Sequence, residues 1–125
     1  MIILDTSIWI EFLKFNPEYF KKIKDLLENQ QIFSLECIFA ELLQGAINIR
    51  ERNILISYWD CLPRCSTENI WIEAGIFSSE NKLISKGIGV IDCVILLSAK
   101  RNNARVCTLD NNLKQILNKG MIYDL

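Results

Sequence analysis

The stretch MIILDTSIWIEFL, residues 1–13, indicates the fold class, because a short apolar run passes directly into an acid and then a helical pattern. Residues 2–4 are apolar without alternation, which is typical of a strand buried on both faces in a parallel sheet. Asp5 stands at the end of this strand, and we expect Thr6 or Ser7 to cap the helix that follows.

The same alternation of strand and helix continues along the chain. We expect further strands at residues 32–35, 104–109 and 121–125, while residues 62–66 form either a short strand or only a loop. Helical patterns lie between them, at residues 17–30, 37–47, 50–62, 67–86 with Thr67 as cap, from residue 90 onward, and at 111–118. Strands that alternate with helices predict an α/β sandwich around a central, mainly parallel sheet.

Composition limits the chemistry that this chain can perform. The 125 residues suit one domain spanning 1–125; half are hydrophobic, and mean hydropathy is +0.18. The net charge of −1 gives no global attraction to nucleic acid, so any such binding needs a local basic patch. Histidine is absent, which removes the commonest general base and the commonest transition-metal ligand.

Five cysteines, an odd number, are interpreted as reduced core residues of a cytoplasmic protein. Cys61 and Cys65 suggest half of a metal site, but no second Cys or His pair completes it. The start of the chain lacks the basic region of a signal peptide. No uncharged apolar run approaches about 18 residues, so we expect no membrane span.

Four acids occupy positions where a carboxylate needs a partner. Asp92 is the only charge between Lys86 and Lys100, and an unpaired carboxylate in apolar surroundings is costly. Asp5 and Asp110 follow predicted strands, at the sheet edge where ligands bind in open parallel sheets. Glu41 and Asp92 lie on predicted helices. If all four face one cleft, a cation must relieve their repulsion, and a carboxylate set without His or thiolate favours Mg²⁺ or Mn²⁺.

Each acid also has a purely structural explanation. Asp5 and Asp110 could cap the helices that follow them, and Asp110 could pair with Lys114. Glu41 could be a solvated helix residue, and Asp92 could be favoured by the positive end of a helix dipole. The functional interpretation therefore depends on the four acids as a set.

At these acids the sequence resembles the PIN-domain family, in particular the small toxin ribonucleases of VapBC-type toxin–antitoxin systems. The likeness extends over nearly the whole chain and consists of four motifs in order, ILDTSIWIEFL, FAELLQG, GVIDCVILLSA and VCTLDNNLKQI. Departures from the family pattern are Leu113 in place of an aromatic residue, Asn111 and Asn112 after Asp110, and bulky residues at 95–97. None of them removes an acid.

The resemblance implies a three-layer α/β/α fold and a Mg²⁺- or Mn²⁺-dependent endoribonuclease. It also implies a homodimer and a cognate VapB-like antitoxin whose tail covers the active site. By this likeness the metal ligands and catalytic residues are Asp5, Glu41, Asp92 and Asp110. The hydroxyls of Thr6, Ser7 and Thr108 either orient these carboxylates or serve only as caps and turn residues.

Contact with RNA is expected at Lys14, Lys21, Lys22 and Lys24, which cluster in sequence with Tyr19 and Phe20 between them. A Lys-rich helix can equally be a solvated face. Trp9, Phe12 and Trp71 are expected in the core, the alternative being an interface.

Two other classes of function compete with the toxin. The stretch ILDTS resembles the nucleophile motif of haloacid-dehalogenase-type phosphatases, but Ser7 stands where that family has a second Asp. The third possibility is a catalytically degenerate PIN domain that binds RNA or a protein.

Overall fold

A small, wholly parallel sheet lies at the centre of the molecule. The computed structural model describes all residues, 1–125. Its sheet has the order β2-β1-β3, with β1 at Ile2–Leu4, β2 at Ile32–Phe33 and β3 at Arg105–Cys107. Ile3 is in register with Phe33 on one side and Val106 on the other. All three residues of β1 are buried, as expected for a strand with helices on both faces.

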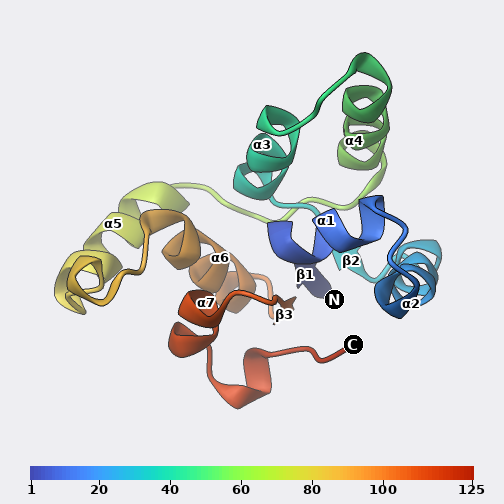
Figure 1. The fold of residues 1–125 in the computed structure, drawn as a ribbon. Coiled ribbons are helices and arrows are strands. Elements are labelled where there is room, and N and C mark those ends of the chain that lie inside the picture. Colours follow the sequence, from blue (N-terminus) through green and yellow to red (C-terminus); the bar gives the residue numbers. More distant parts are fainter.

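Helices enclose this sheet. Their bounds are α1 Thr6–Leu13, α2 Pro17–Glu28, α3 Glu36–Gln44, α4 Ile49–Cys61, α5 Ile70–Glu80, α6 Val90–Arg101 and α7 Asn111–Ile116. Figure 1 looks nearly along β1 and shows α5, α6 and α7 on one side of the strands and α2 on the other. The predicted α/β sandwich with a parallel sheet is therefore confirmed.

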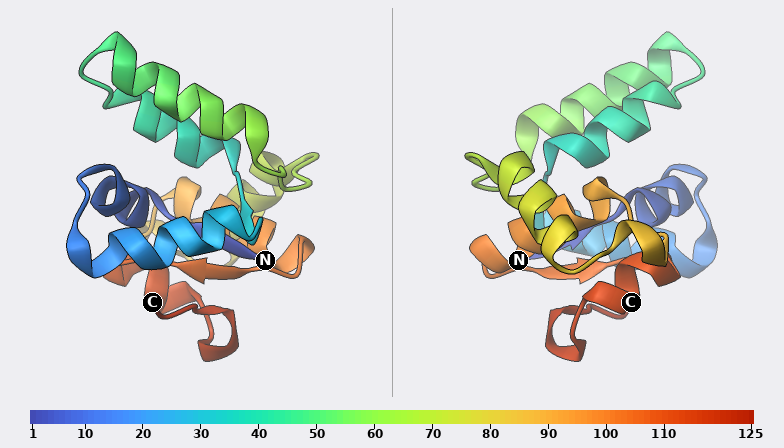
Figure 2. Two further views of the ribbon diagram at one scale, coloured as in Figure 1. Left: turned by 90° about the vertical axis from the view of Figure 1, so that its right-hand side faces the viewer. Right: turned by 90° about the vertical axis from the view of Figure 1, so that its left-hand side faces the viewer.

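The helices α3 and α4 form a hairpin that projects from the rest of the molecule (Figure 2). Gly45 ends α3, and the Asn48 side chain caps α4 by accepting a hydrogen bond from the Glu51 N–H at 2.8 Å. Trp9 of α1 packs against both helices at the base of this hairpin. Its ring centroid lies 5.3 Å from that of Phe39 in α3 and 5.3 Å from that of Tyr58 in α4. Packing of Trp9 thus fixes where α3 stands relative to α1.

Several expected helix boundaries differ from those observed. Asp5, rather than Thr6 or Ser7, caps α1, and Thr67 is not the cap of α5. The helix expected over 67–86 runs only from Ile70 to Glu80 and is followed by a separate 3-10 turn at Ile84–Lys86. Lys82 between them has a left-handed backbone (φ 52°), which no helix can continue through. This turn brings Leu83 back into the core.

Segments at the two edges of the sheet form little regular strand structure. The strand expected over 121–125 is reduced to one bridge between Val106 and Ile122, because a 3-10 turn occupies Lys119–Met121. Residues 62–66 contribute one bridge, between Ser34 and Arg64, and β2 itself covers only two residues. Apolar content alone did not distinguish these segments from full strands. Among the helices, none combines the length and hydropathy that a membrane span requires.

The aromatic residues divide between core and surface. Trp9 and Phe12 are buried, with Trp9 only 1% exposed, as expected. Trp71 is 49% exposed on α5, so its predicted place in the core was wrong. The neighbouring Ile70 and Ala74 face α6 instead.

Trp9→Ala should lower the free energy of unfolding by about 3–5 kcal/mol, because it removes the largest fully buried side chain and leaves a cavity between α1, α3 and α4. The control is Ile84→Ala, at a side chain that is 85% exposed, which should cost less than about 1 kcal/mol. Urea denaturation followed by circular dichroism measures both. Equal losses for the two variants would contradict the packing described here.

Candidate acidic site

Four carboxylates from four different elements line one pocket. Asp5 follows β1, Asp110 follows β3, Glu41 is in the middle of α3, and Asp92 is in the first turn of α6. The pocket has a volume of about 310 Å³, and its walls include Thr6, Ser7, Ile10, Gly89, Ile91 and Ile95. The structure therefore brings together residues that are far apart in sequence, at the carboxyl ends of the strands.

Asp5 is the most firmly held of the four. It is 7% exposed, and its backbone N–H donates to the Cys107 carbonyl at 3.0 Å. Oδ1 accepts the Thr6 N–H at 2.7 Å, while Oδ2 accepts the Ser7 hydroxyl at 3.2 Å and the Thr108 hydroxyl at 2.7 Å. Three donors to one carboxylate fix its orientation and compensate its burial.

The hydroxyls of this site serve two purposes at once. Thr6 Oγ1 donates to Glu41 Oε1 at 3.0 Å and so connects α1 with α3. Ser7 Oγ accepts the Leu109 N–H at 3.0 Å, and Thr108 Oγ1 accepts the Asp110 N–H at 2.9 Å. All three hydroxyls therefore contact carboxylates, and two of them also satisfy backbone groups after β3.

Asp110 and Asp92 lie at helix N-termini, where a carboxylate can also serve as a helix cap or be stabilised by the helix dipole. Asp110 is exposed and caps α7 through the Asn112 N–H at 2.8 Å, but no ion pair joins it to Lys114. Asp92 is half-buried at the start of α6. Helix capping and a place in the pocket are compatible, because each carboxylate has more acceptor positions than the cap uses.

Negative charge in the pocket is not neutralised by the protein. Burial raises the pKa of Asp92, Asp110 raises it further, and Asp5 and Glu41 add to this effect against a partial lowering by the Gly89 backbone. The ion pairs of the molecule lie elsewhere, and none involves these four acids. A cation from outside the chain would relieve this repulsion.

The donor set fits a hard divalent ion. Carboxylates and hydroxyls are oxygen ligands, and no thiolate competes with them. Cys37, one turn before Glu41, is buried, and burial together with Glu41 raises the pKa of its thiol to about 12. No group of three or more His, Cys, Asp or Glu side chains already stands in an arrangement that could hold an ion. Asp5, Glu41, Asp92 and Asp110 would be the residues that hold such an ion, since all four line the same pocket.

Cys61 and Cys65, the pair considered from the sequence, lie in different surroundings. All five cysteines are free, with Cys61 exposed and Cys65 buried. Burial raises the pKa of the Cys65 thiol to about 12, which keeps it protonated.

The four lysines expected to contact RNA do not share one location. Lys14 borders a hollow of about 280 Å³ that also touches Thr6, Ile10 and Glu41 of the acidic pocket. Lys24 borders a separate apolar pocket. Lys21 and Lys22 are exposed on α2, where Lys21 pairs with Asp25 at 3.9 Å. Of the four, Lys14 is thus the one next to the acids.

Sequence reasoning missed the apolar and glycine residues of the pocket wall. Ile10, Ile91 and Ile95 lie on helices α1 and α6, and Gly89 immediately precedes α6. The helical spacing of Ile91 and Ile95 around Asp92 was the available signal, because residues three or four positions apart share a helix face.

A family model described as PIN domain matches residues 2–118, so the chain belongs to the PIN-domain family. Two solved structures share the fold. The first is a chain in the crystal structure of VapBC2 from Rickettsia felis bound to a DNA fragment from their promoter. Its sequence is 24% identical to this chain, and the TM-score is 0.68. The match covers 98% of this chain and 96% of that chain. The second, a chain in the crystal structure of FitAcB from Neisseria gonorrhoeae, is 18% identical with a TM-score of 0.53, covering 90% of each chain. A comparison with curated proteins gave no match.

Asp92→Asn should stabilise the metal-free protein at pH 7. The pKa of this carboxyl is raised in the folded state above its ordinary value of 3.8, so ionisation opposes folding once the pH exceeds that value. Below it both states are protonated and the gain should vanish. Urea denaturation in EDTA at pH 7 and at about pH 3 measures the difference.

Asp25→Asn on α2 is the control, since that carboxylate is exposed and is not part of the acidic pocket. It should change the unfolding midpoint little at either pH. An Asp92→Asn variant that is less stable than the parent at pH 7 would show that the carboxylates do not repel one another as described.

Proposed function

We propose that this PIN-domain protein is a metal-dependent endoribonuclease that acts as the toxin of a toxin–antitoxin pair. The observation that supports this most directly is the convergence of Asp5, Glu41, Asp92 and Asp110 on one pocket without a neutralising cation of the protein. Membership of a family that consists largely of nucleases supports a hydrolase at the coarser level.

The four carboxylates would hold Mg²⁺ or Mn²⁺. When bound, such an ion supplies charge neutralisation at the phosphate and activates water for hydrolysis of the phosphodiester bond. The residues of the chain supply orientation. Thr108 and Ser7 fix Asp5, and Thr6 fixes Glu41, so these two carboxylates present defined faces to the pocket. Asp92 and Asp110 stand on the rim at helix N-termini, where the dipoles favour negative groups, including a phosphate.

Removal of one ligand acid should abolish RNA cleavage while the fold survives. Asp92→Asn and Glu41→Gln are the informative changes, since both keep side-chain size and remove charge. Glu36→Gln, exposed at the start of α3, is the matched control and should cleave like the parent. The assay is cleavage of a structured RNA with Mg²⁺ or Mn²⁺ against EDTA, together with calorimetric measurement of metal uptake.

Each alternative function would give a different experimental result. RNA binding without cleavage would identify a degenerate PIN domain, and hydrolysis of phosphate monoesters would identify a phosphatase. Full activity of Asp92→Asn would reject the assigned metal ligands.

An antitoxin partner is part of the proposal. The solved structures of like fold are described as VapBC2 and FitAcB, of which the first is bound to a fragment of promoter DNA. A small DNA-binding protein encoded next to this chain, able to bind it and suppress RNA cleavage, would support the toxin assignment. The free thiols of all five cysteines are consistent with the cytoplasm, where RNA substrates occur.

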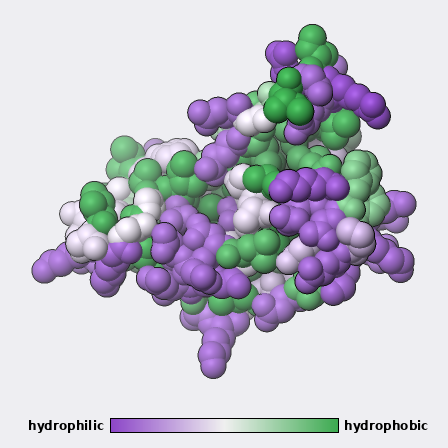
Figure 3. Space-filling model, viewed as in Figure 1, coloured by the Kyte–Doolittle hydropathy of each residue, from purple (hydrophilic) through white to green (hydrophobic).

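We further propose that the protein is a homodimer, and the outer face of α5 supports this. Trp71, Ile72 and Ile76 are exposed there, at 49%, 69% and 54%, and Figure 3 shows apolar atoms gathered over this helix. Exposed apolar patches of this kind are typical of interfaces.

Ile76→Glu should shift the sedimentation of the protein from dimer to monomer, because it places a charge in the apolar face. Glu80→Lys, at the exposed end of the same helix, is the control and should leave the mass unchanged. A parent protein that sediments as a monomer at all concentrations would contradict the proposed dimer.

A further inference from the structure

Three hollows that share wall residues lie in a row along α1 and are together called the groove. The acidic pocket and the hollow beside Lys14 share Thr6, Ile10 and Glu41 as walls. That hollow in turn shares Leu13 and Glu51 with an apolar pocket of about 610 Å³. The groove therefore leads from the carboxylates, past Lys14, to the space between the α1–α2 turn and α4.

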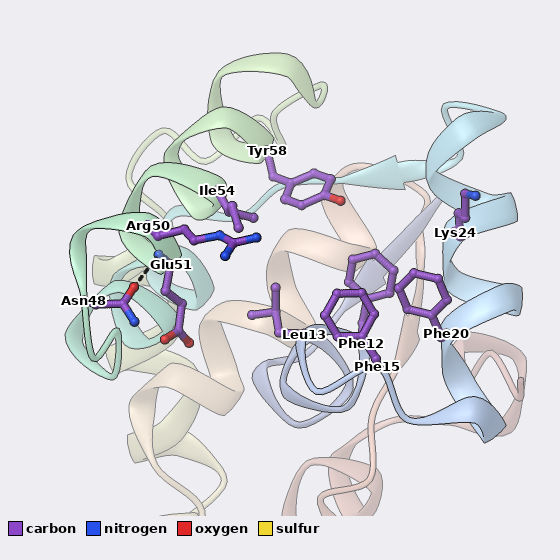
Figure 4. Close-up of a pocket in the computed structure, with 10 residues that line it drawn as sticks. All are labelled: Phe12, Leu13, Phe15, Phe20, Lys24, Asn48, Arg50, Glu51, Ile54 and Tyr58. Atoms are coloured by element: carbon purple, nitrogen blue, oxygen red, sulfur yellow. Dashed lines mark hydrogen bonds between the residues drawn. The ribbon is translucent and has the colours of Figure 1, made fainter.

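The far end of this groove is lined by aromatic rings. Figure 4 shows Phe12, Phe15 and Phe20 side by side on one wall, opposite Ile54 and Tyr58 of α4. The rings of Phe12 and Phe20 are parallel to within 10°, with centroids 5.1 Å apart, and Phe15 lies 5.1 Å from Phe20. Phe12 and Phe20 cover one another, so the exposed ring of Phe15 is the one that can accept another flat group.

Phe15 is the member of this wall that packing does not explain. Its side chain is 71% exposed, so it adds little to the core. Its backbone is left-handed, with φ of 57°, a conformation that suits Gly or Asn and is unfavourable for a bulky residue. The left-handed conformation itself ends α1, because the Asn16 N–H donates to the Glu11 carbonyl, so it is the large exposed ring at this position that packing leaves unexplained.

Basic side chains border the groove. Lys24 and Arg50 border the apolar pocket, and Lys14 borders the hollow before it. Lys14 and Arg50 form no ion pair with a carboxylate. A ligand that combines flat apolar groups with regularly spaced negative charges fits this arrangement, and single-stranded nucleic acid is such a ligand.

Resting on the proposed ribonuclease function, we infer that the aromatic pocket is a subsite for an unpaired nucleobase of the RNA substrate. The base stacks on Phe15, the strand runs along α1, and Lys14 contacts a phosphate between this subsite and the carboxylates. Phe15 is thus a binding residue that no acidic motif contains. Lys21 and Lys22 lie outside the groove and take no part in this path.

The test compares substitutions that separate stacking from apolar contact. Binding of a single-stranded RNA with a fluorescent base, 2-aminopurine, is titrated in EDTA to prevent cleavage. Phe15→Ala should weaken binding about tenfold, in line with the loss of one base stack. Phe15→Leu should weaken it similarly, whereas Phe15→Trp should retain it. Ile84→Ala removes an exposed apolar side chain outside the groove and should leave binding unchanged.

Cleavage kinetics provide the second readout. With Mg²⁺ present, Phe15→Ala should raise KM about tenfold and change kcat little, because the residue is remote from the carboxylates. Circular dichroism checks that the variants fold.

The outcomes distinguish the subsite from the function on which it rests. A parent protein that cleaves RNA, with Phe15→Ala and Phe15→Leu binding RNA as tightly as the parent, overturns the subsite alone. Loss of binding to a protein partner in these variants, with RNA binding intact, would assign the pocket to that partner. A parent protein that neither binds nor cleaves RNA overturns both proposals.

Discussion

The hydrogen bonds to the Asp5 carboxylate are the constraint on which the rest of the site depends. This carboxylate is buried at the end of the central strand and accepts the Thr6 N–H, the Ser7 hydroxyl and the Thr108 hydroxyl. Thr108 joins the ends of β1 and β3, and Thr6 extends the connection to Glu41 on α3. A network of this kind is stable only when all of its members are satisfied, so it sets the position of each element that contributes to the pocket.

The position of Glu41 depends on apolar packing as well. Trp9 lies one turn beyond Asp5 on α1 and packs against Phe39 of α3, two residues before Glu41. The hydrogen bond from Thr6 then fixes the carboxylate itself. Packing thus sets the distance between α1 and α3, and the hydroxyl selects the orientation. The fold and the candidate site are therefore built from the same contacts.

The sequence predicted β1 and β3 because each is a short, largely apolar run that is followed within three residues by an acid. The four motifs located the acids. The sequence did not predict the helix end at Glu80, because the apolar pattern continues through Leu83 and Ile84 while the backbone turns at Lys82. The strand at 121–125 failed for a similar reason, since composition does not specify pairing partners. The groove beyond Lys14 could not be predicted, because its walls come from α1, α2 and α4 and meet only in the folded chain.

The placement of the N-terminal strand in the middle of the sheet has a consequence for biosynthesis. Asp5 and its partner Thr108 are 103 positions apart, so the carboxylate gains this bond only after Thr108 has left the ribosome. Until then the first strand lacks its neighbour β3, and Asp92 and Asp110 are not yet beside the other acids. A nascent chain therefore has no complete acidic pocket until the segment that contains Thr108 and Asp110 has emerged.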